Sequence, residues 1–245
     1  MKTCSIALLA LLLAGGTPLV AQEPAPAPAP AQAEQGLRVR GLSFALTTAP
    51  TEVYAHDAAS PPGIPGTKVD VKNYLNHEFN LLPIKGKGIV FTKSSDPGSV
   101  KDNASVLAKA SLPDNFRSGI LMFLPGTGAA GTPAYRILVV EDTVRAFPRG
   151  SFKVMNLSPT TLRIQLEKET FEFKGGEMKL IEKPPVNDSN ASGMRAFAQV
   201  GNQWQKVGAG IWPNPGSKRV IQVAFENPNT KQLEIRGIRD ISVND

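Results

Sequence analysis

The chain has 245 residues, a formal net charge of +6, two histidines and a single cysteine, Cys4. One cysteine cannot form an intramolecular disulfide, a multi-cysteine zinc site or an iron–sulfur cluster. The basic residues are spread out, with Lys218-Arg219 as the longest contiguous basic pair, which argues against nucleic acid as a partner. The charge predicts a slightly basic soluble surface, and attraction to anionic glycans, lipopolysaccharide or peptidoglycan is the alternative interpretation.

Residues 1–21 have the layout of a secretory signal peptide. Lys2 precedes an apolar run at residues 6–14, and Ala21 places a small residue before a plausible cleavage point. The run is too short to span a membrane, which takes about 20 residues, and an N-terminal core helix is the alternative. Cys4 precedes the run, so it cannot be a lipoprotein cysteine. We expect a periplasmic or extracellular protein whose mature chain has no cysteine and no transmembrane segment.

Residues 22–36 form a linker in which proline and alanine alternate. Proline fixes φ and lacks an amide donor, so this segment can neither continue a helix nor pair in a sheet. The composition predicts an extended, semi-rigid spacer.

From residue 37 onward, short apolar runs alternate with turn residues at a spacing typical of all-β sandwiches. The strict alternation in residues 162–166 predicts a strand with one buried face. Residues 120–124 are apolar throughout and predict a central strand buried on both faces. The predicted strands are 37–47, 52–56, 68–74, 79–83, 88–92, 105–110, 120–124, 135–141, 152–157, 162–166, 170–173, 178–182, 195–200, 204–209, 219–225 and 233–238.

Three blocks of the sequence recur in the same order and indicate an internal repeat. The first aligns Val69, Val71, Asn73, Phe79 and Leu81 with Phe152, Val154, Asn156, Leu162 and Ile164. The second aligns Leu112-Pro113 with Trp212-Pro213, and Ile120, Leu121 and Phe123 with Val220, Ile221 and Val223. The third aligns residues 136–142 with 234–240. Coincidental β alternation is the alternative. The repeat predicts two tandem immunoglobulin-like β-sandwich modules, at residues 37–143 and 144–245.

The segment 151–184 contains a strand ending in Val154, Asn156, Leu157 and Ser158, followed by paired strands that carry Lys174-Gly175-Gly176. This unit resembles one in secreted bacterial tandem β-sandwich proteins of unknown function, and in periplasmic accessory proteins of exopolysaccharide modification. The resemblance covers about a third of the chain. It implies a β-sandwich in an exported protein, and it transfers no catalytic residue.

Residue types that carry catalysis are sparse. His56 and His77 are the only histidines, no Gly-x-Ser-x-Gly motif is present, and the two histidines lack zinc-binding spacing. His56 stands beside Asp57, and such a pair can act as an oriented base or be a surface pair at a strand end. The carboxylates of Glu141-Asp142 and Asp240 lie at matched ends of the repeat, which indicates strand-end caps rather than a glycosidase pair. We therefore predict no enzyme, no metal site and no cofactor, with a hydrolase as the alternative.

Binding features concentrate in the second module. Trp204 and Trp212 flank Lys206, and an exposed tryptophan on a sheet can stack against the C–H face of a sugar. A core position is the alternative for both, especially for Trp212, which aligns with Leu112 in the repeat. The sequence predicts a non-catalytic, envelope-associated structural or interaction module with an envelope protein or polysaccharide as partner. Carbohydrate binding through Trp204, Lys206 and Trp212 is the alternative function.

Overall fold

The computed structural model describes residues 36–241 except 62 and 76. The described chain is all-β, which confirms that part of the prediction, and it includes one short 3-10 helix, η1 (Pro97–Lys101). The segment from Gln35 to Asp245 forms one compact unit. The predicted signal peptide and nearly all of the predicted linker lie outside the described residues. Within those residues, no helix has the length and apolar character needed to cross a bilayer.

The N-terminal half, residues 37–141, builds two sheets. Sheet A consists of β4 (Val71–Lys72), β1 (Leu37–Ser43), β8 (Ser118–Pro125) and β9 (Tyr135–Glu141), with β5 (Asn80–Leu82) also paired to β1. Sheet B consists of β3 (Thr67–Lys68), β2 (Tyr54–Asp57), β6 (Gly88–Thr92) and β7 (Val106–Ser111). Strand β1 runs parallel to β8, so sheet A departs from the two antiparallel sheets of an immunoglobulin-like sandwich.

The C-terminal half, residues 152–240, builds the other two sheets of the described chain. Sheet C consists of β13 (Met178–Ile181), β10 (Phe152–Asn156), β16 (Arg219–Glu226) and β17 (Leu233–Asp240). Sheet D consists of β12 (Glu169–Phe173), β11 (Leu162–Leu166), β14 (Ala191–Val200) and β15 (Gln203–Pro213). Again the first strand, β10, runs parallel to the central β16. Among the described residues, no strand of one half pairs with a strand of the other.

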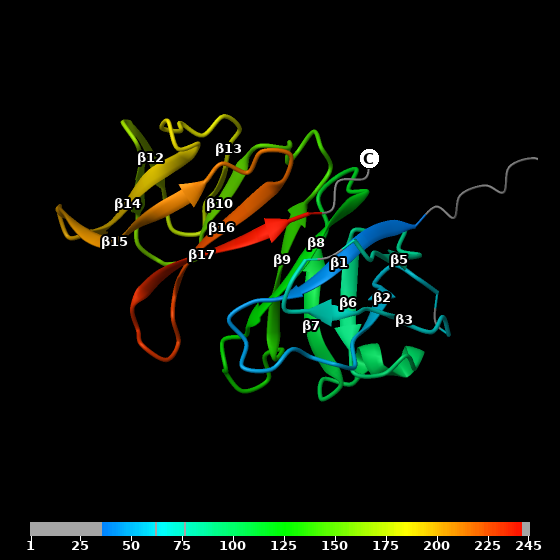
Figure 1. Cartoon of the computed structure of the whole chain (residues 1–245). Coiled ribbons are helices and arrows are strands. Elements are labelled where there is room, and N and C mark those ends of the chain that lie inside the picture. Colours follow the sequence, from blue (N-terminus) through cyan, green and yellow to red (C-terminus); the bar gives the residue numbers. More distant parts are fainter. Residues whose placement is uncertain (1–35, 62, 76, 242–245) are drawn as a thin grey trace, which may run out of the picture. The chain divides into compact units, whose positions relative to one another are not determined.

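The sheets lie as layers in the order B, A, C, D (Figure 1). Side chains of one core fill the space between B and A, a second core lies between A and C, and a third lies between C and D. Strand β8 shows why residues 120–124 are apolar throughout. Ile120 and Met122 point into the core against sheet C, whereas Leu121 and Phe123 point into the core against sheet B. Both faces of this strand are covered, as predicted.

The two halves have the same strand order, but the first predicted repeat match aligns the wrong strands, and the second is shifted by one residue in β8 and β16. Strand β10 corresponds to β1, because each is the parallel partner of the central strand of its sheet. Asn156 in β10 therefore does not correspond to Asn73, which follows β4. Ile120 packs between sheets A and C together with Ile221, whereas Val220 faces sheet D. A shift of one residue turns every side chain to the other face, and hydrophobicity alone does not separate the two registers when both faces are buried.

A buried ionic cluster joins the halves between sheets A and C. Asp240, at the end of β17, accepts hydrogen bonds from Arg40 Nη1 at 2.6 Å and from Arg219 Nε at 3.0 Å. Arg40 Nη2 also donates to Asp142 Oδ2 at 2.7 Å, and Asp142 accepts from the hydroxyl of Ser118 at 2.6 Å. The carboxylates at the matched strand ends are thus partners of buried arginines rather than solvent-facing caps. Arg40 and Asp240 are 200 residues apart, so their pairing leaves no local pattern in the sequence.

Asn156, in the segment that carries the family resemblance, organises a corner of the C-terminal half. It is fully buried, and its side-chain amide donates to the carbonyl oxygens of Thr160, Phe173 and Lys174. Its Oδ1 accepts from the amide and the hydroxyl of Ser158. These bonds satisfy backbone groups where β10 turns toward β11, so the Asn-Leu-Ser element has a structural role.

Candidate functional site

The three predicted binding residues lie on strand β15 but do not share a face. Trp204 is partly exposed and pairs with the exposed Gln199, and Lys206 is exposed on the same outer face. Trp212 is 6% exposed and packs in the core between sheets C and D, with its ring centroid 5.1 Å from that of Phe152. The structure therefore brings Trp204 and Lys206 together and separates Trp212 from them.

A β-bulge at Val207 causes this separation. The partners of Phe197 and Ala196 on β15 are Lys206 and Gly208, so Val207 is an extra residue in the ladder. Without the bulge, the even-numbered Trp204 and Trp212 would point to the same side of the sheet. An extra residue inverts the alternation beyond it, which turns Trp212 into the core. Strand β7 has a matching register shift, with Leu107 as the extra residue.

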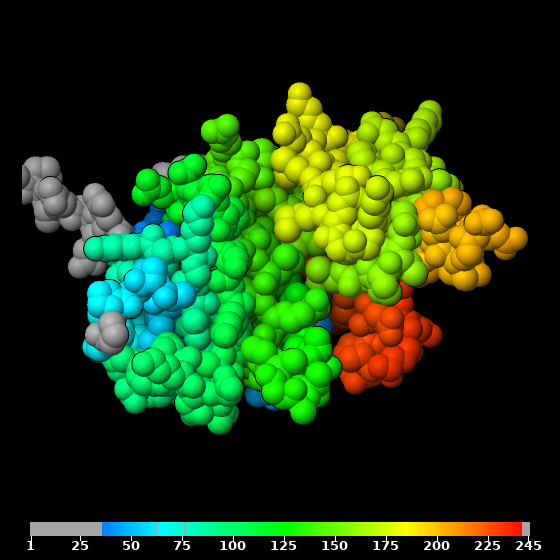
Figure 2. All heavy atoms as spheres, turned by 180° about the vertical axis from the view of Figure 1, so that it is seen from behind, coloured from blue at the N-terminus to red at the C-terminus, as the bar shows by residue number. Residues whose placement is uncertain are grey.

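The outer face of sheet D carries cations interleaved with aromatic and apolar side chains. We define it by Arg163, Arg195, Phe197, Trp204, Lys206 and Ile211, whose alternation places them all away from the core. Ile211 is 72% exposed, and Arg195 and Lys206 are exposed without an acidic partner among the described residues. In Figure 2, the orange end of the β14–β15 hairpin juts out from the molecule, away from the N-terminal half. This face is therefore open to a large ligand.

The ring of Trp204 is held in place by Arg163. The guanidinium carbon lies 3.9 Å from the centroid of the indole ring, within the range of a cation–π contact. Glu172 accepts hydrogen bonds from Arg163 Nε at 2.9 Å and Nη2 at 2.5 Å, which fixes the guanidinium plane. An aromatic ring fixed in this way needs little further ordering when a ligand binds to it.

A shallow hollow of about 300 Å³ lies beside these cations. Gly193 and Gly210 line it and Arg195 stands at its edge, so missing side chains create the depression. Glu167 also lines the hollow, and its carboxylate accepts hydrogen bonds from the backbone amide of Gly193 at 2.5 Å and from Asn187 at 3.3 Å. The hollow offers room for a polar group next to the exposed guanidinium of Arg195.

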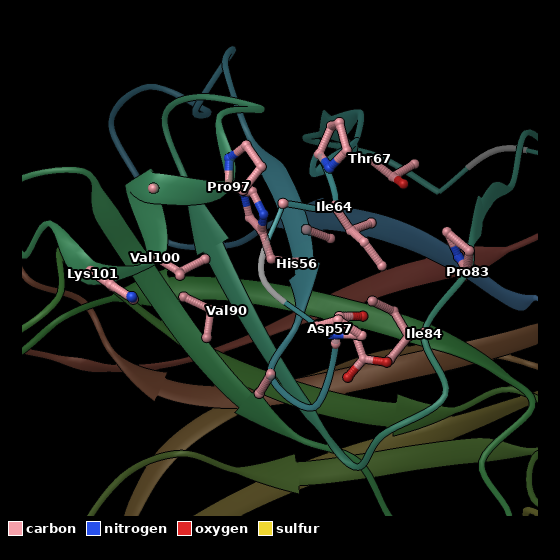
Figure 3. A pocket seen from close by; sticks show the side chains of 17 residues that line it. His56, Asp57, Ile64, Thr67, Pro83, Ile84, Val90, Pro97, Val100 and Lys101 are labelled. Atoms are coloured by element: carbon pink, nitrogen blue, oxygen red, sulfur yellow. The ribbon is translucent and has the colours of Figure 1, made fainter.

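A second hollow, of about 420 Å³, lies over sheet B and contains His56 in its wall (Figure 3). Its lining is mostly apolar and includes Ile64, Ile84, Val90 and Val100. These side chains come from the loop after β2, from the segment between β5 and β6, from β6 and from η1.

The environment of His56 is that of a structural residue. Its Nε2 lies 2.9 Å from Thr92 Oγ1 and 3.2 Å from the carbonyl oxygen of Ser94, which can only accept. The hydroxyl of Ser99 lies 3.5 Å from this nitrogen and donates to the carbonyl oxygen of Asp96 at 2.6 Å, so its hydrogen is directed away from His56. The network fixes η1 against β6.

Asp57 does not orient His56, because neighbouring residues on a strand point to opposite sides. Figure 3 shows the imidazole turned toward Pro97 and the carboxylate turned toward Ile84. Burial raises the pKa of Asp57, but hydrogen bonds from the backbone amides of Ala59, Lys85 and Gly86 more than offset this and hold the pKa below its ordinary value. Asp57 thus stabilises two loops rather than forming a catalytic pair.

His77 is exposed and lies far in sequence from the strand that carries His56. Within the part of the chain that the structure describes, no group of three or more His, Cys, Asp or Glu side chains is placed to bind a metal ion. No protein-family model matches the sequence, and no curated protein matches it significantly.

Proposed function

We propose that this chain is an exported, non-catalytic envelope protein whose C-terminal half binds an anionic polysaccharide through the outer face of sheet D. The observation that carries the proposal is the Arg163–Trp204 stack beside the exposed cations Arg195 and Lys206, which have no acidic partner in the described part of the chain. The ring would pack against the C–H face of a sugar, and the cations would neutralise its carboxylates or phosphates.

The proposal includes a signal peptide at residues 1–21, a spacer at residues 22–36 and two tandem β-sandwich modules. A Pro-Ala spacer would hold the folded part at a distance from an envelope layer. The common strand order of the halves supports a tandem arrangement, in which each half would be an immunoglobulin-like sandwich modified by a parallel pair at the centre of one sheet. The arrangement of His56, Ser99 and Asp57 gives no support to a hydrolase.

An anionic polymer serves as the test ligand. We expect the chain lacking residues 1–21 to bind alginate, a polyuronate, and to bind the neutral polymer dextran much more weakly. The Trp204→Ala variant should bind alginate about tenfold more weakly, because the stacking surface is lost. Added salt should weaken the binding of alginate, since it screens the attraction between the exposed cations and the carboxylates of the polymer. Affinity electrophoresis in gels that contain each polymer measures these differences.

The matched control is Tyr74→Ala. Tyr74 is a 56% exposed aromatic residue in the N-terminal half, and Lys72 Nζ lies 5.9 Å from its ring centroid. This variant should bind alginate as the unmodified chain does. Equal binding of alginate and dextran, or an equal loss in the Trp204 and Tyr74 variants, would refute the proposal.

A further inference from the structure

The C-terminal half contains a slot of about 410 Å³ between sheets C and D. It lies where the edge strands β15 and β17 face each other and where the two sheets are in only slight contact. Phe152, Met194 and Trp212 form apolar parts of its wall, and Gln222, Gly237 and Arg239 line the side formed by β16 and β17. This volume is within the range of small-molecule sites in proteins.

At the equivalent position between sheets A and B, the N-terminal half is filled by apolar side chains. The cross-strand pair Leu121–Val139 on β8 and β9 corresponds to Gln222–Gly237 on β16 and β17, because both pairs occupy the same position in equivalent ladders. Leu121 is fully buried and Val139 packs against the same core. In the C-terminal half, an amide and a glycine replace these two apolar side chains, so the sheets lose the residues that would seal them together.

The pair that faces them from the opposite sheet shows a similar change. Ile89–Ala110 on β6 and β7 corresponds to Met194–Gly210 on β14 and β15. A methyl group on Gly210 would meet only the terminal carbon of Met194, at 3.8 Å, so close packing does not require glycine here. Gly237, in contrast, makes room for the side-chain amide of Gln222. A Cβ at residue 237 would lie only 3.1 Å from Gln222 Oε1, closer than an ordinary contact. The slot is thus built by small residues around one amide.

Two polar side chains of β16 and β17 line the slot, Gln222 and Arg239. Gln222 is 6% exposed, and its side-chain amide makes no hydrogen bond with the described residues. The atoms of this amide reach the solvent in the slot, so a ligand there can form hydrogen bonds with them in place of water. Arg239 has no acidic partner in the described chain, and no described carboxylate lines the slot. We infer that the slot binds a small carboxylate with an apolar body, which packs against Trp212 and Phe152 while its carboxylate pairs with Arg239 and accepts from Gln222.

The slot shares Met194, Ala209 and Gly210 with the hollow on the outer face of sheet D, but the residues that would bind the carboxylate are different ones, and the test uses different probes. The two probes are 3-phenylpropionate and its neutral analogue 3-phenylpropanamide. The chain has two tryptophans, so Trp204→Phe leaves Trp212 as the only indole fluorophore. In this background, we expect 3-phenylpropionate to change the Trp212 emission with saturation, and the neutral amide to bind at least about tenfold more weakly.

Two variants locate the site. Arg239→Gln alters an exposed side chain, so the fold should persist while binding of the carboxylate weakens about tenfold and binding of the amide does not change. The double variant Gln222→Leu with Gly237→Val restores the pair found in the N-terminal half and should abolish binding of both probes. No saturable response to 3-phenylpropionate, or equal binding by the Arg239 variant, would overturn the inference even if the double variant does not fold. The alginate experiment with the Trp204→Ala variant tests the outer face of sheet D, and its outcome does not bear on the inference about the slot.

Discussion

Replacement of Asp240 by asparagine is expected to lower the free energy of unfolding by about 3–5 kcal/mol. Asp240 is fully buried and accepts hydrogen bonds from both Arg40 and Arg219. Asparagine keeps the size of the side chain but removes a buried charge that pairs with both guanidinium groups. Burial lowers the pKa of Arg40, but the bonds and charges of Asp240 and Asp142 more than offset this and raise it above its ordinary value. The cation therefore persists at every pH at which the protein would be studied.

Urea denaturation followed by tryptophan fluorescence measures the loss. The control is Asp114→Asn, which removes a carboxylate from the exposed Lys87–Asp114 ion pair and should change stability little. If the Asp240 variant loses no more stability than the Asp114 variant, the cluster does not hold the halves together.

Lys153 should make the protein more stable as the pH rises from about 8 to about 10.5. Burial, assisted by the nearby charge of Arg219, lowers the pKa of Lys153 from 10.5 to about 8, and the charges of Glu141 and Asp142 offset only part of this. In this window the unfolded chain binds a proton that the folded chain has released, so unfolding becomes less favourable as the pH increases. The gain should approach about 2–3 kcal/mol at the top of the window.

The Lys153→Met variant isolates this contribution. Its free energy of unfolding, measured by urea denaturation at a series of pH values, should lack the rise that the unmodified chain shows above pH 8. The slope is the useful quantity, because the variant also loses the hydrogen bond from Lys153 Nζ to the carbonyl oxygen of Glu141. Parallel pH profiles for the two proteins would show that Lys153 is not desolvated in the folded state.

The sequence identifies the strands because alternation and turn residues are local signals. Thus β6 (Gly88–Thr92), β9 (Tyr135–Glu141) and β11 (Leu162–Leu166) have their predicted bounds. The apolar run at residues 120–124 also indicated correctly that sheet A is covered on both faces. For the candidate site, the three residues selected from the sequence lie on one strand, β15, and two of them, Trp204 and Lys206, share its outer face.

The sequence did not predict that Arg163 and Arg195 share this face, because they lie on other strands of sheet D, β11 and β14. Their positions on the same side of alternating strands were readable in the sequence, but the pairing partner of each strand was not.

The sequence by itself determined the strands and the all-β class, because these depend on the nearest neighbours along the chain. The tertiary structure decided the rest. It paired Arg40 with Asp240 across 200 residues, and it exposed Gln222 to a slot that Leu121 closes in the other half. It also turned Trp212 away from Trp204, because one extra residue at Val207 reverses the direction of every side chain that follows it in the strand.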